Sequence, residues 1–252
     1  MYLVLAITLV IAVALVIYMV YNAYHDNIDS KNIQIGLSST EPLKLFFISD
    51  VHTRIIREET IKACNKGIDL VVIGGDLVEK KVPLNRVRTN LTSLQAFNVP
   101  IYFIWGNNDY EKSVSQLQDL FNECNVTTIK NNAITFVHKQ SSISLVGIDC
   151  CKIGNPDFNS AISKATGDYS ILLSHDPSGF YGLTDQELEK INLGLSGHTH
   201  GGQIRLFGFG PYTRGGLKYY KSKPIFISEG YGFTKLPFRL GTQSECHILT
   251  IN

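Results

Sequence analysis

The sequence has little net charge, few cysteines and no internal repeat or low-complexity block. Lys and Arg number 23 and Asp and Glu number 22, so the formal charge is only +1 over 252 residues. A general nucleic-acid binder needs a basic excess, and this function class is therefore not indicated. With 44% hydrophobic and 18% charged residues, the composition describes one ordinary globular domain plus a short additional segment.

The five cysteines form an odd set without a C-x-x-C pair. This pattern argues against a disulfide framework and against a structural zinc knuckle. Cys150 and Cys151 are adjacent, and a redox-active pair is the alternative, but neighbouring residues rarely reach disulfide geometry without strain. The interpretation that remains is a set of buried or free thiols.

Charge is absent from the beginning of the chain. Tyr2–Tyr21 holds 20 residues with Thr8 as its only strongly polar side chain, which is the length of one membrane crossing. The segment has no basic region before it and no small-x-small cleavage site, so an uncleaved anchor in the cell membrane is favoured over a cleaved signal peptide. Lys31 and Lys44, which follow the span, and the unpaired cysteines point weakly to a cytoplasmic catalytic domain.

After the anchor, residues 22–42 are polar and lack sustained periodicity, so they are interpreted as a tether in which Ile33–Ile35 pairs as an edge strand. A single domain is expected over residues 43–252. Short apolar runs suited to buried strands alternate there with helical patterns such as Leu84–Leu94 and Val114–Cys124, which predicts an α/β layered core. The runs are Leu43–Ser49, Asp69–Ile73, Ile101–Trp105, Ile143–Ile148, Ser170–Leu173, Leu193–Leu195, Ile225–Ser228 and Cys246–Ile251.

Polar residues of the types that bind metals lie just after five of these runs. Each alone has an ordinary explanation, because GGD is usually a turn and a lone His at a strand end is usually structural. Together they lie where α/β sheets build their sites, in the crevice at the carboxyl ends of the strands. The seven candidate ligands are Asp50, His52, Asp76, Asn107, His175, His198 and His200, whereas His25, His138 and His247 lie outside these loops.

Seven ligands are too many for one four-coordinate ion but suit two divalent ions that share a carboxylate. Carboxylates, imidazoles and an amide, without thiolate, favour Mn, with Fe or Zn as alternatives. Two such ions would generate hydroxide near neutral pH and attract phosphate, so hydrolysis of a phosphate ester or anhydride is expected. A metallo-β-lactamase-like hydrolase would need an H-x-H-x-D-H cluster, and the sequence has HTHGGQ instead.

The ordered set D-x-H, GGD, GN-x-D, SHDP and GHTHGG resembles the calcineurin-like metallophosphoesterase family. The segments GGQIRLFGFGPY and SEGYGFTKLPFRLG are similar to its membrane-associated bacterial branch, which includes lipid-linked sugar-nucleotide pyrophosphatases such as UDP-diacylglucosamine hydrolase. The resemblance implies a four-layer αββα sandwich. It also implies one metal held by Asp50, His52, Asp76 and His200, and another held by Asp76, Asn107, His175 and His198.

The sequence departs from the family pattern at one position. The family motif has GNH followed by Asp or Glu, whereas this chain has Asn108 before Asp109, and these two residues are the catalytic candidates. An amide can hydrogen-bond to a phosphoryl oxygen but cannot deliver a proton to the leaving group. We interpret the change as a shift in leaving-group preference. The alternative is a catalytically weak or silent metal-binding scaffold.

Two arginines and one loop are candidates for substrate contact. Arg54 and Arg205 follow ligand loops, and either guanidinium could hold a non-transferred phosphate, although a solvated surface role is the simpler alternative. The glycine-rich and aromatic stretch Phe207–Tyr220 could flank a lipid or nucleobase pocket, and core packing explains it equally well. The expected partners are the membrane and a phosphorylated small molecule or lipid.

Overall fold

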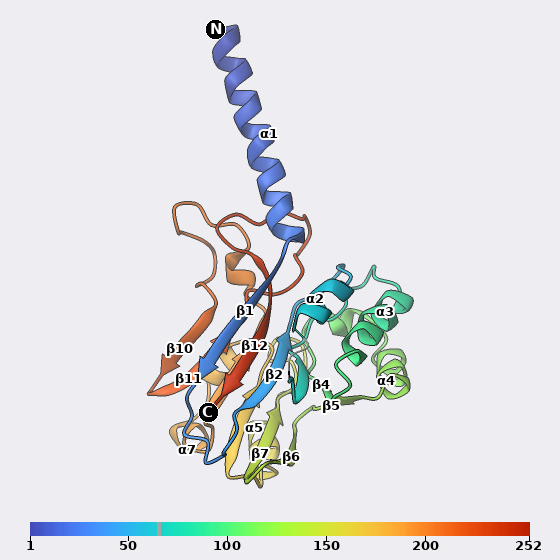
Figure 1. The fold of residues 1–252 in the computed structure, drawn as a ribbon, viewed down its shortest axis with the longest axis vertical. Helices are drawn as coiled ribbons and strands as arrows, with labels where there is room; N and C mark the ends of the chain where they lie inside the picture. Colours follow the sequence, from blue (N-terminus) through green and yellow to red (C-terminus); the bar gives the residue numbers. More distant parts are fainter. Residues whose placement is uncertain (65–66) are drawn as a thin grey trace.

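The computed structural model describes residues 1–64 and 67–252 as two six-stranded sheets packed face to face, with helices on both outer faces (Figure 1). The first sheet has the order β1-β12-β2-β3-β4-β5, and the second has the order β10-β11-β9-β8-β7-β6. In sheet order, the first comprises Asp26–Ile33, Ser244–Ile251, Leu43–Ile48, Leu70–Ile73, Ile101–Phe103 and Val126–Thr128. The second comprises Gly216–Tyr220, Lys223–Ile227, Leu193–Ser196, Tyr169–Leu173, Ser141–Gly147 and Asn132–His138. The predicted αββα fold is confirmed.

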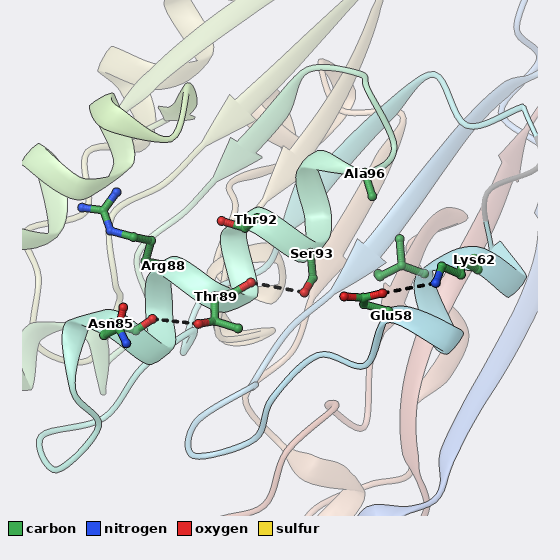
Figure 2. A pocket seen from close by; sticks show the side chains of 9 residues that line it. Glu58, Lys62, Asn85, Arg88, Thr89, Thr92, Ser93 and Ala96 are labelled. Atoms are coloured by element: carbon green, nitrogen blue, oxygen red, sulfur yellow. Dashed lines mark hydrogen bonds and ion pairs between the residues drawn. The ribbon is translucent and has the colours of Figure 1, made fainter.

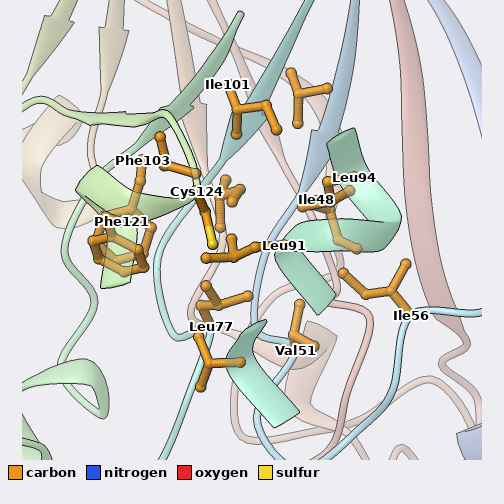
Figure 3. Close-up of a cluster of buried hydrophobic side chains, with 14 of the residues drawn as sticks. Ile48, Val51, Ile56, Leu77, Leu91, Leu94, Ile101, Phe103, Phe121 and Cys124 are labelled. Atoms are coloured by element: carbon orange, nitrogen blue, oxygen red, sulfur yellow. The ribbon is translucent and has the colours of Figure 1, made fainter. Parts of the chain in front are cut away.

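Alternation of side chains along the strands separates the layers. On β2, Leu45 and Phe47 face the second sheet, whereas Phe46 and Ile48 face the helices on the other side. Figure 3 shows the helix-facing cluster, in which Leu91 and Phe121 pack against strand residues. The helices of this layer are α2 (Glu58–Cys64), α3 (Leu84–Gln95) and α4 (Val114–Glu123).

A separate cluster covers the outer face of the second sheet. Val146, Leu172 and Ile225 point from the strands towards Ile162 and Phe180 on the helices. The helices are α5 (Phe158–Ser163), α6 (Ser178–Tyr181) and α7 (Asp185–Glu189), and α7 begins with a capping box formed by Thr184 and Glu187. Two 3₁₀ turns, η1 (Asp109–Glu111) and η2 (His200–Gly202), lie directly at the predicted ligand loops.

The N-terminal helix α1 (Tyr2–Tyr24) projects away from the domain (Figure 1). Its best 18-residue window has a mean hydropathy of 3.1 and is 0% buried within the protein. These properties are those of a membrane-spanning helix, as predicted. Its last turns contact the domain, where Asn22 and Ala23 are buried.

The segment predicted as a tether differs from that expectation. Asp26–Ile33 forms β1, an eight-residue edge strand that pairs in parallel with β12 over its whole length, from Asp26 opposite Ser244 to Ile33 opposite Ile251. The predicted edge pairing at Ile33–Ile35 is only the end of this contact, where the Ile35 amide donates to the Asn252 carbonyl. Polar residues are tolerated because β1 lies at the edge of the sheet, where burial is incomplete.

Candidate metal centre and active site

The seven predicted ligands lie together at the carboxyl ends of five strands. Asp50 and His52 follow β2, Asp76 follows β3, Asn107 follows β4, His175 follows β8, and His198 and His200 follow β9. The two sheets therefore contribute from opposite sides to one volume, as expected for strand ends in an α/β protein. Within the described residues the side chains form two compact groups, Asp50–His52–His200 and Asp76–His175–His198.

In the first group, three donors converge on one point. The Nε2 atoms of His52 and His200 lie 3.1 Å apart, and the His200 Nε2 lies 3.5 Å from the Asp50 Oδ1. All three residues are buried. Two imidazole nitrogens and a carboxylate aimed at one point are the donor set of a divalent transition-metal ion.

The second group repeats this arrangement beside the first. The His198 Nδ1 and His175 Nε2 are 3.2 Å apart, and the His175 Nε2 lies 3.3 Å from the Asp76 Oδ2. The same Asp76 oxygen lies 3.9 Å from the His52 Nε2 of the first group. Asp76 thus reaches histidines of both groups, and so does Asp50, whose Oδ1 lies 4.0 Å from the His175 Nε2. The bridging role of Asp76 stays a prediction from the family resemblance.

Asn107 adds an observation that favours a metal. Its Oδ1 atom is buried and has no hydrogen-bond partner among the described residues, although its Nδ2 donates to the Asn108 Oδ1 at 2.8 Å. A buried amide oxygen without a partner is costly, and a cation beside it would remove the cost. The residues present thus fit two divalent ions.

The backbone is in the left-handed region at most of these positions. Asp50, His52, Asp76, His198 and His200 have φ values between 48° and 70°. Non-glycine residues rarely adopt this conformation, and it concentrates at functional sites, where surrounding structure holds it. Here the loops turn sharply at each strand end, so that side chains from both sheets reach the same centre.

Charge within the site fixes protonation. Burial by itself would lower the pKa of His175, but the carboxylates of Asp76 and Asp50 raise it to about 10. Burial would raise the pKa of Asp76, and the neighbouring His175 lowers it to about 2. For His200, burial and the nearby His52 and Arg239 hold the pKa well below its usual value. His200 is therefore neutral, which is the form that binds metals, whereas His175 carries a proton that a bound ion would displace.

The two catalytic candidates occupy different environments. The Asn108 backbone amide donates to the Asp76 Oδ1 at 2.7 Å, and its side-chain Nδ2 lies 3.1 Å from the His52 Nδ1 at the edge of the cavity. Asp109 is fully buried and accepts amide hydrogen bonds from Asp76 and Gly106, both at 2.8 Å. Burial and the charge of Asp76 raise the pKa of Asp109 to about 7. Asp109 therefore links the loop that carries Asp76 to the loop that carries Asn107, and its hydrogen bond to the Asp76 amide helps to position that ligand.

The predicted role of Arg54 in substrate binding needs correction. Arg54 is 5% exposed, and its Nη2 lies 2.6 Å from the Asp26 Oδ1 on β1. The Arg54 Nη1 donates to the Tyr231 carbonyl at 2.8 Å. The guanidinium points to the base of α1 and is engaged in an internal ion pair, because Asp26 belongs to the domain and not to a tether.

Arg205 also uses its guanidinium within the protein. It donates to the Gly201 carbonyl at 2.9 Å and to the carbonyls of Gly208 and Tyr212. These contacts fix the loop that follows η2, so the predicted phosphate contact is not supported. The interpretation of Arg205 as a solvated surface side chain is not supported either.

Sequence reasoning missed several residues that contact the ligands, among them Asp176, whose Oδ2 lies 3.5 Å from the His198 Nε2. The Glu79 Oε2 lies 3.6 Å from the His52 Nδ1, and the buried Arg239 places its Nη2 3.2 Å from the His200 Nδ1. Glu79 follows GGD closely in the sequence, which is a weak local signal. Arg239 is 39 residues from His200 in the sequence, so no local sequence signal pointed to this contact.

The site opens into a cavity of about 700 Å³. Its lining combines ligands with cationic and anionic side chains, namely Thr53, Asp76, Glu79, Lys80, Lys81, Asn107, Asn108, Glu111, His198, His200, Thr234 and Lys235. A second cavity of about 480 Å³ lies between α2 and α3 (Figure 2). It contains no predicted ligand, and its Glu58 and Lys62 pair with each other at 3.2 Å.

The remaining histidines and the cysteines lie outside the site. His25 stacks on Tyr21, His138 ends β6, and the buried His247 lies 2.9 Å from the Ser228 Oγ. The five cysteines are free, and four of them are buried. Both observations agree with the interpretation made from the sequence.

The sequence is similar to a known protein family and to individual bacterial and animal proteins. Residues 43–202 match the calcineurin-like phosphoesterase family model. The chain is 40% identical over 212 residues to YpbG of Bacillus subtilis, covering 83% of this chain and 81% of YpbG. It is 27% identical over 233 residues to a transmembrane protein with metallophosphoesterase domain from Bos taurus, covering 82% of this chain and 52% of that protein.

The fold is also similar to that of solved structures whose sequence identity to this chain is low. Sulfate thiohydrolase SoxB of Thermus thermophilus superimposes with a TM-score of 0.56 at 12% identity, covering 86% of this chain and 57% of SoxB. This chain therefore spans little more than half of SoxB and of the Bos taurus protein.

Proposed function

The chain belongs to the calcineurin-like phosphoesterase family, and from this premise we propose that it is a membrane-anchored hydrolase of phosphate esters or anhydrides that uses two divalent metal ions. The observation that carries the proposal is the pair of ligand groups, with Asp76 close to histidines of both. Asp50, His52, Asp76 and His200 would hold one ion, and Asp76, Asn107, His175 and His198 the other. We propose Mn as the ion, with Fe or Zn as alternatives, because the donors are carboxylate, imidazole and amide.

Two divalent ions held by these residues would supply a hydroxide near neutral pH and would stabilise the charge on the attacking and leaving oxygens. The chain itself supplies binding and orientation. Lys80, Lys81 and Lys235 line the cavity and favour an anionic substrate, while Glu79 and Glu111 limit the positive charge. A phosphorylated small molecule, a nucleotide or a lipid-linked phosphate would fit this charge pattern. We place the catalytic domain on the cytoplasmic side of the cell membrane.

Asn108 determines which leaving groups depart readily. Its amide can donate a hydrogen bond to a phosphoryl oxygen but has no proton to transfer. Substrates that leave as stable anions, such as aryl esters or the phosphate of an anhydride, are therefore favoured over alkyl esters. The Asn108 side chain already contacts His52 and Asn107, so its orientation is set before substrate binds.

The first experiment measures metal content of the full chain in detergent. Two ions per chain are expected. Asp76→Asn should weaken binding of both ions and Asp50→Asn mainly of one, while Asp185→Asn, which changes an exposed carboxylate paired with Lys221, should leave both bound. Fully active wild-type protein with at most one tightly bound ion would contradict the two-metal proposal.

The second experiment separates the enzyme from the silent scaffold, which Asn108 makes the competing proposal. Wild-type protein and Asn108→His are compared at saturating metal on esters with graded leaving-group pKa, nucleotide anhydrides and lipid-linked diphosphates. Asn108→His should accelerate the poorest leaving groups most, by up to about 100 to 10,000-fold if the imidazole is well placed. Two bound metals without turnover in either protein would favour the scaffold, and equal leaving-group slopes would refute the role of Asn108.

A further inference from the structure

Two loops beside the metal cavity are tied to the end of the membrane helix. The Arg239 amide donates to the Met19 carbonyl at 3.0 Å, and the Asn22 side chain donates back to the Arg239 carbonyl at 3.4 Å. Met19 belongs to the apolar run Tyr2–Tyr21, whose 20 residues span about 30 Å as a helix, the thickness of the bilayer core. The segment around Arg239 therefore lies at the edge of the bilayer whenever α1 crosses it.

The second loop is fixed to the first. The Leu240 amide donates to the Gln203 carbonyl at 3.0 Å, and the Arg205 amide donates to the Leu240 carbonyl at 2.7 Å. The Gln203 side chain also accepts from the Thr234 amide at 2.8 Å. Residues 203–214 and 234–242 thus form one unit at the end of the domain where α1 leaves it (Figure 1). We call this unit the membrane-side loops.

The tip of the membrane-side loops presents apolar side chains to the outside. Leu206 and Phe209 exchange two backbone hydrogen bonds of 2.9 Å across Phe207 and Gly208, which have φ values of 50° and 85°. This tight turn ordinarily takes Asn, Asp or Gly at its first central position, and here it holds a phenylalanine. Phe207 is 91% exposed and Phe209 is 82% exposed, and Leu236 on the other loop is also exposed.

We propose that this tip enters the interface of the bilayer that α1 crosses. The contacts with Met19 set the level of the loops, and the exposed aromatic side chains supply the apolar surface that an interfacial segment needs. Neither 203–214 nor 234–242 contains an acidic residue, and the exposed Lys235 suits phosphate headgroups. The bilayer is thus the partner that matches both the chemistry and the position of the surface.

The membrane-side loops also reach the metal cavity. Thr234 and Lys235 line it, and the Tyr212 ring centroid lies 6.3 Å from that of His198. The cavity is therefore held close to the bilayer surface. This geometry favours, as the substrate, an amphiphile whose phosphate lies at that surface and whose apolar part stays in the lipid. This inference about the substrate rests on the proposed function.

The docking is tested by fluorescence of the full chain in liposomes with and without brominated lipid. Trp105 is the only native tryptophan and is buried in the core, so it provides a constant background. The emission added by Phe207→Trp should fall about twofold with brominated lipid, because an interfacial side chain lies within reach of the acyl chains. Val137→Trp is the matched control, since Val137 is 73% exposed on β6 at the far end of the domain (Figure 1).

Unquenched Phe207→Trp emission, or equal quenching of Val137→Trp, would overturn the docking. This readout needs no activity, so it stands apart from the proposed function. The substrate class is tested by the ratio of turnover on a bilayer-embedded phosphorylated lipid to turnover on a soluble aryl phosphate. Phe207→Asp with Phe209→Asp should lower this ratio about tenfold relative to Val137→Asp, as expected for loss of apolar contact. An unchanged ratio in an active enzyme would overturn the substrate class.

Discussion

Replacing Asp26 by asparagine should destabilise the domain, although the residue lies outside the catalytic site. The Asp26 carboxylate is 6% exposed and binds Arg54, whose side chain is 3% exposed, at 2.6 Å. It also pairs with Arg57 at 2.9 Å and accepts hydrogen bonds from Thr60 and Tyr231. Asp26→Asn keeps the shape of the side chain but leaves the buried guanidinium of Arg54 without its anion.

The size of the effect follows from the pKa of the carboxyl group. Burial would raise this pKa, but hydrogen bonds from Arg57, Thr60 and Tyr231 and the charge of Arg54 lower it from 3.8 to about 2. The fall of the Asp26 pKa from 3.8 to about 2 corresponds to about 2.5 kcal/mol of stability. Removing one partner of a buried ion pair costs about 3 to 5 kcal/mol in other proteins. We therefore expect Asp26→Asn to lower the free energy of unfolding by about 3 kcal/mol at pH 7.

The lowered pKa of Asp26 also determines how the stability difference between wild type and Asp26→Asn changes with pH. A carboxyl group with a lowered folded-state pKa contributes its full stability above the unfolded value of 3.8 and loses it as the pH falls through about 2. The difference between wild type and Asp26→Asn should therefore be constant near neutral pH and shrink between pH 4 and 2. The assay is urea unfolding of the full chain in detergent, followed through the buried Trp105.

The control for this experiment is Glu58→Gln, which breaks the exposed pair with Lys62 and should cost less than about 0.5 kcal/mol. An unfolding free energy of Asp26→Asn within about 0.5 kcal/mol of wild type at pH 7 would refute the argument. A large difference that persists unchanged at pH 2 would also refute it, because the loss would then not come from the charge.

Three further predictions concern the sheet edge, the site and the core. A chain starting at Leu43 lacks β1 and should unfold at lower urea than one starting at Asn22; equal midpoints would contradict the pairing of β1 with β12. Asp109→Asn should weaken metal affinity about 10 to 100-fold in a metal titration, because it disturbs the support of Asp76, while the exposed Asp119→Asn should not. Phe121→Ala should lower the unfolding free energy by about 3 to 5 kcal/mol in urea, since it empties part of the helix-facing core.

Local rules predicted most of the fold and the position of the ligands. Buried strands such as β2 and β3 are continuous apolar runs, and parallel strands bring their carboxyl ends to the same edge. Asp50 and Asp76 could therefore be placed near one another by their positions after these runs, whereas His175 follows β8 of the other sheet and reaches them through the packing of the two sheets. The assignment of each ligand to an ion remains a prediction, since it depends on the resemblance to the family.

Non-local pairing explains what the sequence did not predict. β1 reads DNIDSKNI, which lacks the alternation of a half-buried strand, and its partner β12 begins at Ser244 near the other end of the chain. The role of Arg54 was wrong for the same reason, since it depends on Asp26 being part of the sheet. The left-handed backbone at His52 and His198 is likewise imposed by the surrounding loops, because neither residue prefers it.

The N-terminal helix α1 and the candidate metal centre share the same structural supports. Arg239 bonds the Met19 carbonyl of α1 through its amide and lies beside His200 through its guanidinium. Arg54, two residues after His52, donates to the Tyr24 carbonyl at the end of α1 and pairs with Asp26 at the start of β1. A flexible tether would leave the site free to tumble above the membrane, whereas these contacts fix its height and orientation. This rigid connection supports the proposal that the chain acts on phosphate groups at one level above the bilayer.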